Sequence, residues 1–192
     1  MLQTMFIAVS SILYVVAYLI YTKSILKGET KPHRTTRLVI LVITALATLA
    51  LFAQGDRVAV WLAGVSAVFC IVIFILSLKH GMGGRSKTDI LCLVLAVIGI
   101  VLWQTTKMPI IALFFSIGAD FIGMVPTLIK TYHLPKTEIW QSFAFATLAG
   151  FFSMLALNSW TIGEFSYPLY IMLINIIMVI LIIRPNFSKK KV

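Results

Sequence analysis

The sequence predicts an all-α transmembrane protein of seven helices, and three observations carry this prediction. Of the 192 residues, 60% are hydrophobic and only 11% are charged, which is more apolar surface than a water-soluble domain can bury. Apolar runs of bilayer-spanning length recur along the whole chain. Basic residues gather in alternate connections between these runs, as they do in the cytoplasmic loops of membrane proteins.

The seven apolar runs follow one another with short connections, and each lies within or just below spanning length. They are Leu2–Tyr21, Thr35–Ala53, Val58–Leu78, Asp89–Gln104, Pro109–Ile129, Ile139–Leu157 and Phe165–Ile183. The first run has no basic segment before it and is longer than the apolar part of a signal peptide, so we expect a retained helix. Residues 1–192 are therefore expected to form a single integral membrane domain.

The distribution of positive charge predicts the orientation. Fourteen of the 16 lysines and arginines fall on one side of the predicted membrane, and only Arg57 and Lys107 fall on the other. Cytoplasmic loops are enriched in basic residues, so we expect the N-terminus outside and the basic tail 184–192 in the cytoplasm of a multi-pass protein of the cell membrane. Because these charges lie in loops, they indicate membrane lipids as partners and no nucleic acid. Formation of a homo-oligomer stays open.

The order of the runs indicates an internal duplication. In a register that aligns Lys27 with Lys130 and Pro32 with Pro135, the first repeat (about 2–78) overlays the second (about 109–183). The run 89–104 is left as a linker helix. Since one spanning linker separates the repeats, the sequence predicts two parallel three-helix bundles related by an axis along the membrane normal.

This arrangement resembles that of the SWEET and PQ-loop proteins. Pro126–Thr127, followed by Lys136–Glu138, is similar to the proline–glutamine dipeptide and the downstream lysine–serine turn of that group. Thr127 stands in place of the glutamine, and Lys23 takes the place of the proline in the first repeat. The resemblance implies a central cavity between the bundles. Members of the group carry sugars, amino acids or vitamins, and some act as cargo receptors.

Asp120 lies near the middle of the fifth run, where an aspartate costs about 2.5–3.5 kcal/mol on insertion scales. Such a residue indicates a binding site, and burial favours its neutral form, so Asp120 could load and release a proton. The structural alternative is a hydrogen bond to Ser116 or to a neighbouring helix that holds the bundle together. Pro126 and Gly123 would let this helix bend as a hinge, and Ala119 with Gly123 also favours close helix packing.

Two more residues complete the predicted substrate-binding site of Asp120, Asn175, Ser116 and Tyr14. Asn175 matches the pocket asparagine that the resemblance implies on the seventh helix, and a helix-packing hydrogen bond is its alternative. Tyr14 is deep enough in the first run that its hydroxyl needs a partner. No catalytic set, metal site or cofactor is expected.

Other polar residues are expected to be structural. His33, His80 and His133 fall in cytoplasmic loops, at a spacing that fits no compact metal site, so solvated side chains are expected. Cys70 and Cys92 lie in separate apolar runs and are expected to be buried as small apolar residues. Thr44 and Thr147 are expected to bond the carbonyls four residues earlier.

The leading functional hypothesis is a SWEET-like transporter of a small polar solute that works by alternating access, with proton coupling through Asp120. The alternative is a membrane receptor or ligand-binding protein of the same fold that does not transport. A membrane enzyme acting on lipid head groups is a third reading. It is disfavoured because no catalytic constellation gathers at one depth, so the chain is expected not to be an enzyme.

Overall fold

The structure is a computed structural model that describes residues 2–54, 57–106 and 108–188, and this part of the chain is entirely helical. The elements are α1 (Leu2–Leu26), α2 (Arg34–Gln54), α3 (Arg57–His80), α4 (Lys87–Thr105), α5 (Pro109–His133), the short 3-10 helix η1 (Pro135–Thr137), α6 (Trp140–Leu155) and α7 (Ile162–Ser188). The seven α-helices fall on the seven predicted runs, so the all-helical class is confirmed. Lys107, Lys189, Lys190 and Lys191, counted above as charges, lie outside the described residues.

The surface of the helices is that of a membrane protein. In the described residues, α1, α4 and most of α5 and α7 are long and apolar enough to cross a membrane. Large apolar side chains stay exposed on several helices, among them Ile12 at 62%, Val68 at 59%, Ile90 at 56% and Ile180 at 55%. A water-soluble protein seldom exposes so much apolar surface, whereas lipid covers it without penalty. The multi-pass prediction is supported directly by these four helices.

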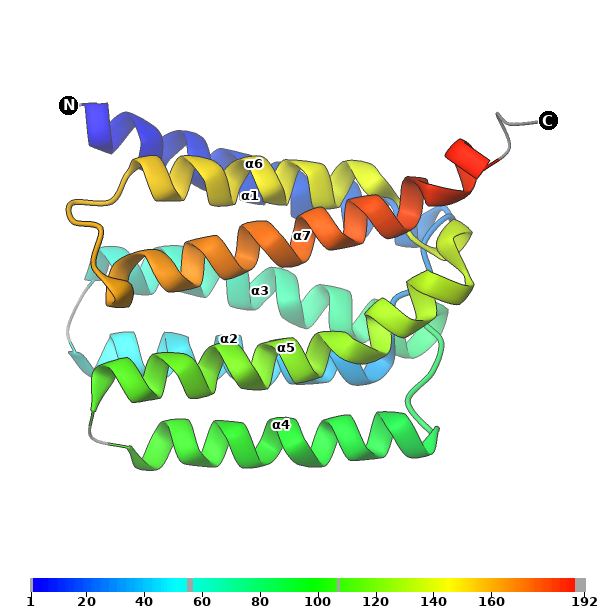
Figure 1. Cartoon of the computed structure of the whole chain (residues 1–192), viewed down its shortest axis with the longest axis horizontal. Coiled ribbons are helices and arrows are strands. Elements are labelled where there is room, and N and C mark those ends of the chain that lie inside the picture. Colours follow the sequence, from blue (N-terminus) through cyan, green and yellow to red (C-terminus); the bar gives the residue numbers. More distant parts are fainter. Residues whose placement is uncertain (1, 55–56, 107, 189–192) are drawn as a thin grey trace.

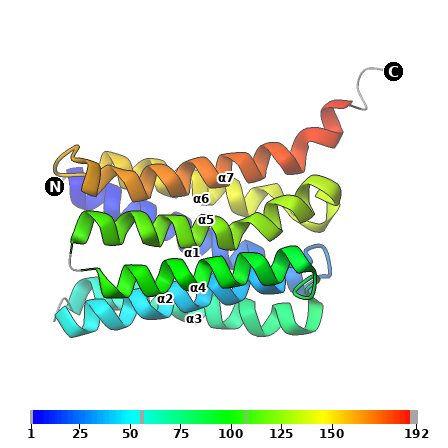
Figure 2. The ribbon, with the colours of Figure 1, turned by 60° about the horizontal axis from the view of Figure 1, so that its bottom comes forward.

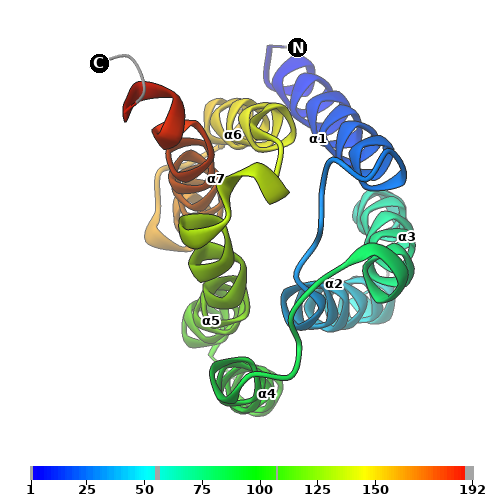
Figure 3. The same cartoon turned by 90° about the vertical axis from the view of Figure 1, so that its right-hand side faces the viewer.

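The helices run along one common axis and alternate in direction (Figures 1 and 2). Viewed from the end, they follow one another around a ring in the order α1, α3, α2, α4, α5, α7, α6, and each contacts its two neighbours (Figure 3). Thus α3 lies between α1 and α2, and α7 lies between α5 and α6. The contact of α1 with α6 closes the ring between segments far apart in the sequence. The two termini lie at opposite ends (Figure 1).

One end of the ring carries most of the charge. The connections 27–33, 81–86 and 134–139 lie there, together with the C-terminal ends of α1, α3, α5 and α7. Lys27, Lys31, Arg85 and Lys136 belong to these connections. We call this the basic end. The other end, at which α2, α4 and α6 finish, is called the opposite end.

The helices approach closely where side chains are small. A Cβ atom added to Gly123 of α5 would lie 2.5 Å from a methyl group of Val39 on α2. A Cβ atom added to Gly99 of α4 would lie 3.0 Å from that of Ala119. The close packing predicted for Ala119 and Gly123 is therefore confirmed. It fixes α5 against α2 and α4, and so sets the depth and direction of the polar residues on α5.

Candidate functional site

A carboxylate and a tyrosine from two helices form the centre of the site. The Tyr170 hydroxyl on α7 donates a hydrogen bond to Asp120 on α5, with 2.5 Å between the oxygens. The helices α5 and α7 are neighbours that run in the same direction, which brings the two residues to a similar depth. Asp120 keeps part of its surface accessible and forms no ion pair among the described residues. The carboxylate is thus held in place by a neutral group.

Further tyrosines surround this pair. The hydroxyls of Tyr14 on α1 and Tyr167 on α7 lie within the electrostatic reach of Asp120, and that of Tyr167 also lies within reach of Cys70 on α3. Tyr167 exposes 43% of its surface, and the groups that act on its hydroxyl come from three other helices. The polar interior draws on α1 and α3 as well as on α5 and α7.

A cavity of about 570 Å³ lies between α1, α3 and α6. Its lining on α1 extends from Ile7 to Tyr14 and Tyr18, and α3 and α6 contribute Ser66 and Ser153. The α1 lining spans about 16 Å at 1.5 Å per residue, which is half of a bilayer core. Tyr14 lines this cavity, whereas Asp120 does not.

A buried ionic network lies at the basic end, beside which a second cavity of about 420 Å³ opens between α2, α3 and the connection 81–86. Lys130 forms an ion pair with Glu138 and donates to the Lys31 carbonyl at 2.7 Å. The Tyr21 hydroxyl donates to the same Glu138 oxygen at 3.2 Å, and the Arg37 guanidinium lies 4.4 Å from the centroid of the Tyr21 ring. Both members of the ion pair are buried. Arg37 and Lys130, counted above as loop charges, therefore hold the interior of this end together.

The same end gathers buried polar atoms without a partner. Seven such side-chain atoms occur in the described residues, on Thr22, His33, Thr36, Arg37, Thr127, Thr131 and Glu138. Buried polar groups are nearly always hydrogen-bonded, so a concentration of exceptions is unusual. All seven lie at the basic end, in the last turns of α1 and α5, the first turn of α2 and the connections beside them.

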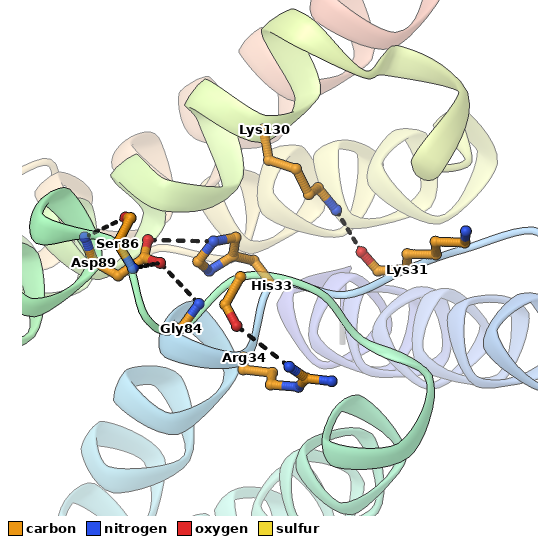
Figure 4. Close-up of polar contacts among 8 residues, drawn as sticks. Lys31, His33, Arg34, Gly84, Ser86, Asp89 and Lys130 are labelled. Atoms are coloured by element: carbon orange, nitrogen blue, oxygen red, sulfur yellow. Dashed lines mark hydrogen bonds and ion pairs between the residues drawn. The ribbon is translucent and has the colours of Figure 1, made fainter.

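The prediction that His33 is solvated is wrong. His33 is buried, and its Nε2 lies 3.3 Å from a carboxylate oxygen of Asp89 at the start of α4 (Figure 4). The other Asp89 oxygen accepts hydrogen bonds from the amides of Gly84 and Ser86. The backbones of His33 and Met82 pair in an isolated β-bridge, which holds the connections 27–33 and 81–86 together. The sequence places His33 in a loop, but the folding of two loops onto each other buries it. His80, the last residue of α3, is half-buried, and His133, the last residue of α5, is exposed.

This burial predicts a pH dependence of stability. Desolvation lowers the pKa of His33 below its ordinary 6.5, against the opposing field of Asp89, and Lys130 and Arg37 lower it further. The unfolded chain then takes up the proton first as the pH falls, so stability is complete above 6.5 and declines below it. We expect the melting temperature to fall between about pH 7.5 and 5.5. His33→Gln should remove part of that fall. His133→Gln, at an exposed position, should leave it unchanged, and an identical fall in all three proteins would contradict the assignment.

The remaining predicted residues lie as follows. Asn175 on α7 donates to the Ile171 carbonyl of its own helix at 2.7 Å. Ser116 lies one turn before Asp120, but the Asp120 hydrogen bond goes to Tyr170 on α7. Pro126 is inside α5, which changes direction toward its C-terminal end (Figure 1). Tyr14 lines the cavity. The structure thus gives Asp120 a partner on α7 and Asn175 a partner in its own helix.

The smaller structural expectations have mixed outcomes. Thr147 bonds the Phe143 carbonyl four residues earlier at 2.9 Å, as predicted. Thr44 instead accepts a contact from the Cys70 thiol at 3.7 Å, and Tyr18 lies 3.9 Å from the same sulfur. Cys70 and Cys92 are both free and buried, as predicted. No group of three histidine, cysteine, aspartate or glutamate residues gathers in the described part of the chain.

Several residues of the site escaped the sequence reasoning. Tyr167 and Tyr170 stand near the start of the seventh run, whereas Asp120 lies near the middle of the fifth. Counting depth from the same side of the membrane therefore pairs Asp120 with Asn175, and it gives no signal for Tyr170. Glu138 offers a weaker signal, as an acidic residue within an otherwise basic connection. Its burial depends on packing that no local pattern shows.

Comparisons of the chain with models of protein families, with curated proteins and with solved structures find no match.

Proposed function

We propose that the protein is a transporter of SWEET-like architecture that carries a small polar solute by alternating access. One observation carries this proposal: Tyr170 holds the carboxylate of Asp120 at mid-depth between α5 and α7, and this carboxylate has no ion-pair partner among the described residues. Packing alone seldom requires an ionisable side chain inside a membrane span, whereas a carrier uses one to bind its solute or a proton.

The order of helices around the ring supports the arrangement of two three-helix bundles with a linker. Helix α3 lies between α1 and α2 as α7 lies between α5 and α6, and the contact of α1 with α6 is matched by that of α5 with α2. These matched contacts are those expected for an axis parallel to the helices. Helix α4 packs on α2 and α5, the place for a linker. Residues from both proposed bundles meet around Asp120.

The orientation follows from the charges. We place the basic end in the cytoplasm, because most of the described basic residues lie there, and the N-terminus outside. The Lys130–Glu138 pair then lies at the cytoplasmic end. Both residues belong to the second repeat and bond Lys31 and Tyr21 of the first, so opening of that end would require these contacts between the repeats to break. Pro126 with Gly123 gives α5 a place to bend. The cell membrane is the proposed location.

Replacement of the carboxylate tests the mechanism. In proteoliposomes loaded with a panel of sugars, amino acids and amines, Asp120→Asn should abolish flux and its dependence on pH, because the amide keeps the size of the side chain but loses the charge. The control is Glu164→Gln, at an exposed position at the start of α7, which should leave flux unchanged. Unchanged flux in Asp120→Asn would remove the residue from the mechanism. Ligand binding without flux in the wild type would favour the receptor alternative.

A further inference from the structure

The carboxylate of Asp120 has no opposite charge beside it. Its hydrogen-bond partner, Tyr170, is neutral. Among the described residues, Arg37 is the basic side chain within electrostatic reach of Asp120. The Arg37 guanidinium, however, lies over the Tyr21 ring and within the field of Glu138 at the basic end. A buried charge is stabilised by a counter-charge with good geometry. The site therefore favours a ligand that brings a positive charge.

Aromatic rings border this carboxylate. Tyr167 and Tyr170 have ring centroids 6.4 Å apart, with the ring planes inclined by 44°. Across the interior, Tyr14 and Tyr18 line the cavity from α1, and the Tyr18 ring is backed by Phe69 with centroids 5.2 Å apart. The face of an aromatic ring attracts a cation within about 6 Å of its centroid, most strongly where water is excluded. Rings beside a carboxylate suit an organic cation better than a sugar, which needs many hydrogen-bonding partners.

We infer that the ligand of the Asp120 site is a small organic cation, with a quaternary ammonium or guanidinium group that lies against Asp120 and the tyrosine rings. This inference rests on the proposed function, since it names the class of solute. A metal ion fits less well, because hard cations require several oxygen ligands and the described residues hold no cluster of three acidic or metal-binding side chains.

A proton and the cation compete for the same carboxylate. The titratable groups that act on Asp120 are Tyr14 from α1, Arg37 from α2, and Tyr167 and Tyr170 from α7, while α4 contributes none among the described residues. Binding of the cation releases one proton from a protonated Asp120 to the aqueous side, so the charge of the site stays the same. Affinity for the cation therefore falls as the pH falls.

The test compares a cation with its neutral isostere. Calorimetric titration of the full-length protein in detergent would use choline and 3,3-dimethylbutan-1-ol, which has carbon in place of the nitrogen, with methylguanidinium as a second cation. At about pH 8 we expect a cation to bind at least about tenfold more tightly than the neutral alcohol, which corresponds to about 1.4 kcal/mol. Binding should weaken as the pH is lowered, because a proton competes with the cation for the carboxylate. Asp120→Asn should remove the preference for charge, and Glu164→Gln should retain it.

The outcomes separate the ligand class from transport. Equal binding of choline and the alcohol, or no binding of either cation, would overturn the inference, and this comparison on the wild type holds even if Asp120→Asn fails to fold. If choline binds but is not carried into proteoliposomes, the proposed ligand class is supported and the proposal of a transporter is overturned. If a neutral solute is transported in a manner that depends on Asp120, and no cation binds, the proposal of a transporter is supported and the proposed ligand class is overturned.

Discussion

Replacement of Glu138 by glutamine should destabilise the protein by about 3–5 kcal/mol, because it leaves the Lys130 ammonium buried without its counter-charge. The side chains of Lys130 and Glu138 expose only 4% and 0% of their surface, so water cannot replace the lost partner. The Tyr21 hydroxyl also loses a charged acceptor. The free energy of unfolding in a detergent–SDS titration measures the effect.

Two comparisons make this test specific. Glu29→Gln breaks an exposed pair with Lys27, 3.9 Å long, and should change stability by roughly 0–1 kcal/mol because water screens both charges. The double variant Lys130→Met with Glu138→Leu removes both charges and should be more stable than Glu138→Gln. If Lys130→Met and Glu138→Leu alone had effects that sum to that of the double variant, the pair would not act as a unit.

Gly83→Ala should destabilise the protein by about 2–5 kcal/mol, from two separate sources. Gly83 has a φ of +74°, which an alanine adopts only with strain. Its added Cβ would also lie 2.0 Å from Nε2 of His33, which is buried and held by Asp89. Either the connection 81–86 or the histidine must move, and the contact between the two loops would be lost.

Gly28→Ala is the matched control. Gly28 has a φ of +76°, and nothing lies within 4 Å of an added Cβ. This variant carries the backbone strain alone, at about 1–2 kcal/mol. The difference in melting temperature between the two variants then measures the contact with His33. Equal losses in Gly83→Ala and Gly28→Ala would show that His33 does not hold the connection in place.

The candidate site was predictable only in part. Asp120 could be singled out because a charge in an apolar run is conspicuous whatever surrounds it, and Tyr14 because a deep hydroxyl needs a partner. Tyr170 could not be singled out, because tyrosines are common near the ends of membrane helices. Only the packing of α7 on α5 shows that Tyr170 contacts Asp120. His33 and Arg37 were misjudged for the same reason. Their sequence neighbourhood is that of a cytoplasmic loop, and their burial comes from segments distant in the chain.

The amino-acid sequence by itself determined the number of helices, their apolar character and the depth of Asp120. Those properties are local, because hydropathy belongs to each residue and a helix satisfies its own backbone hydrogen bonds. Only the tertiary structure decided the partner of Asp120 and the burial of the Lys130–Glu138 pair. These depend on the rotation of each helix about its axis, which packing between segments far apart in the sequence sets, as Gly123 against Val39 does.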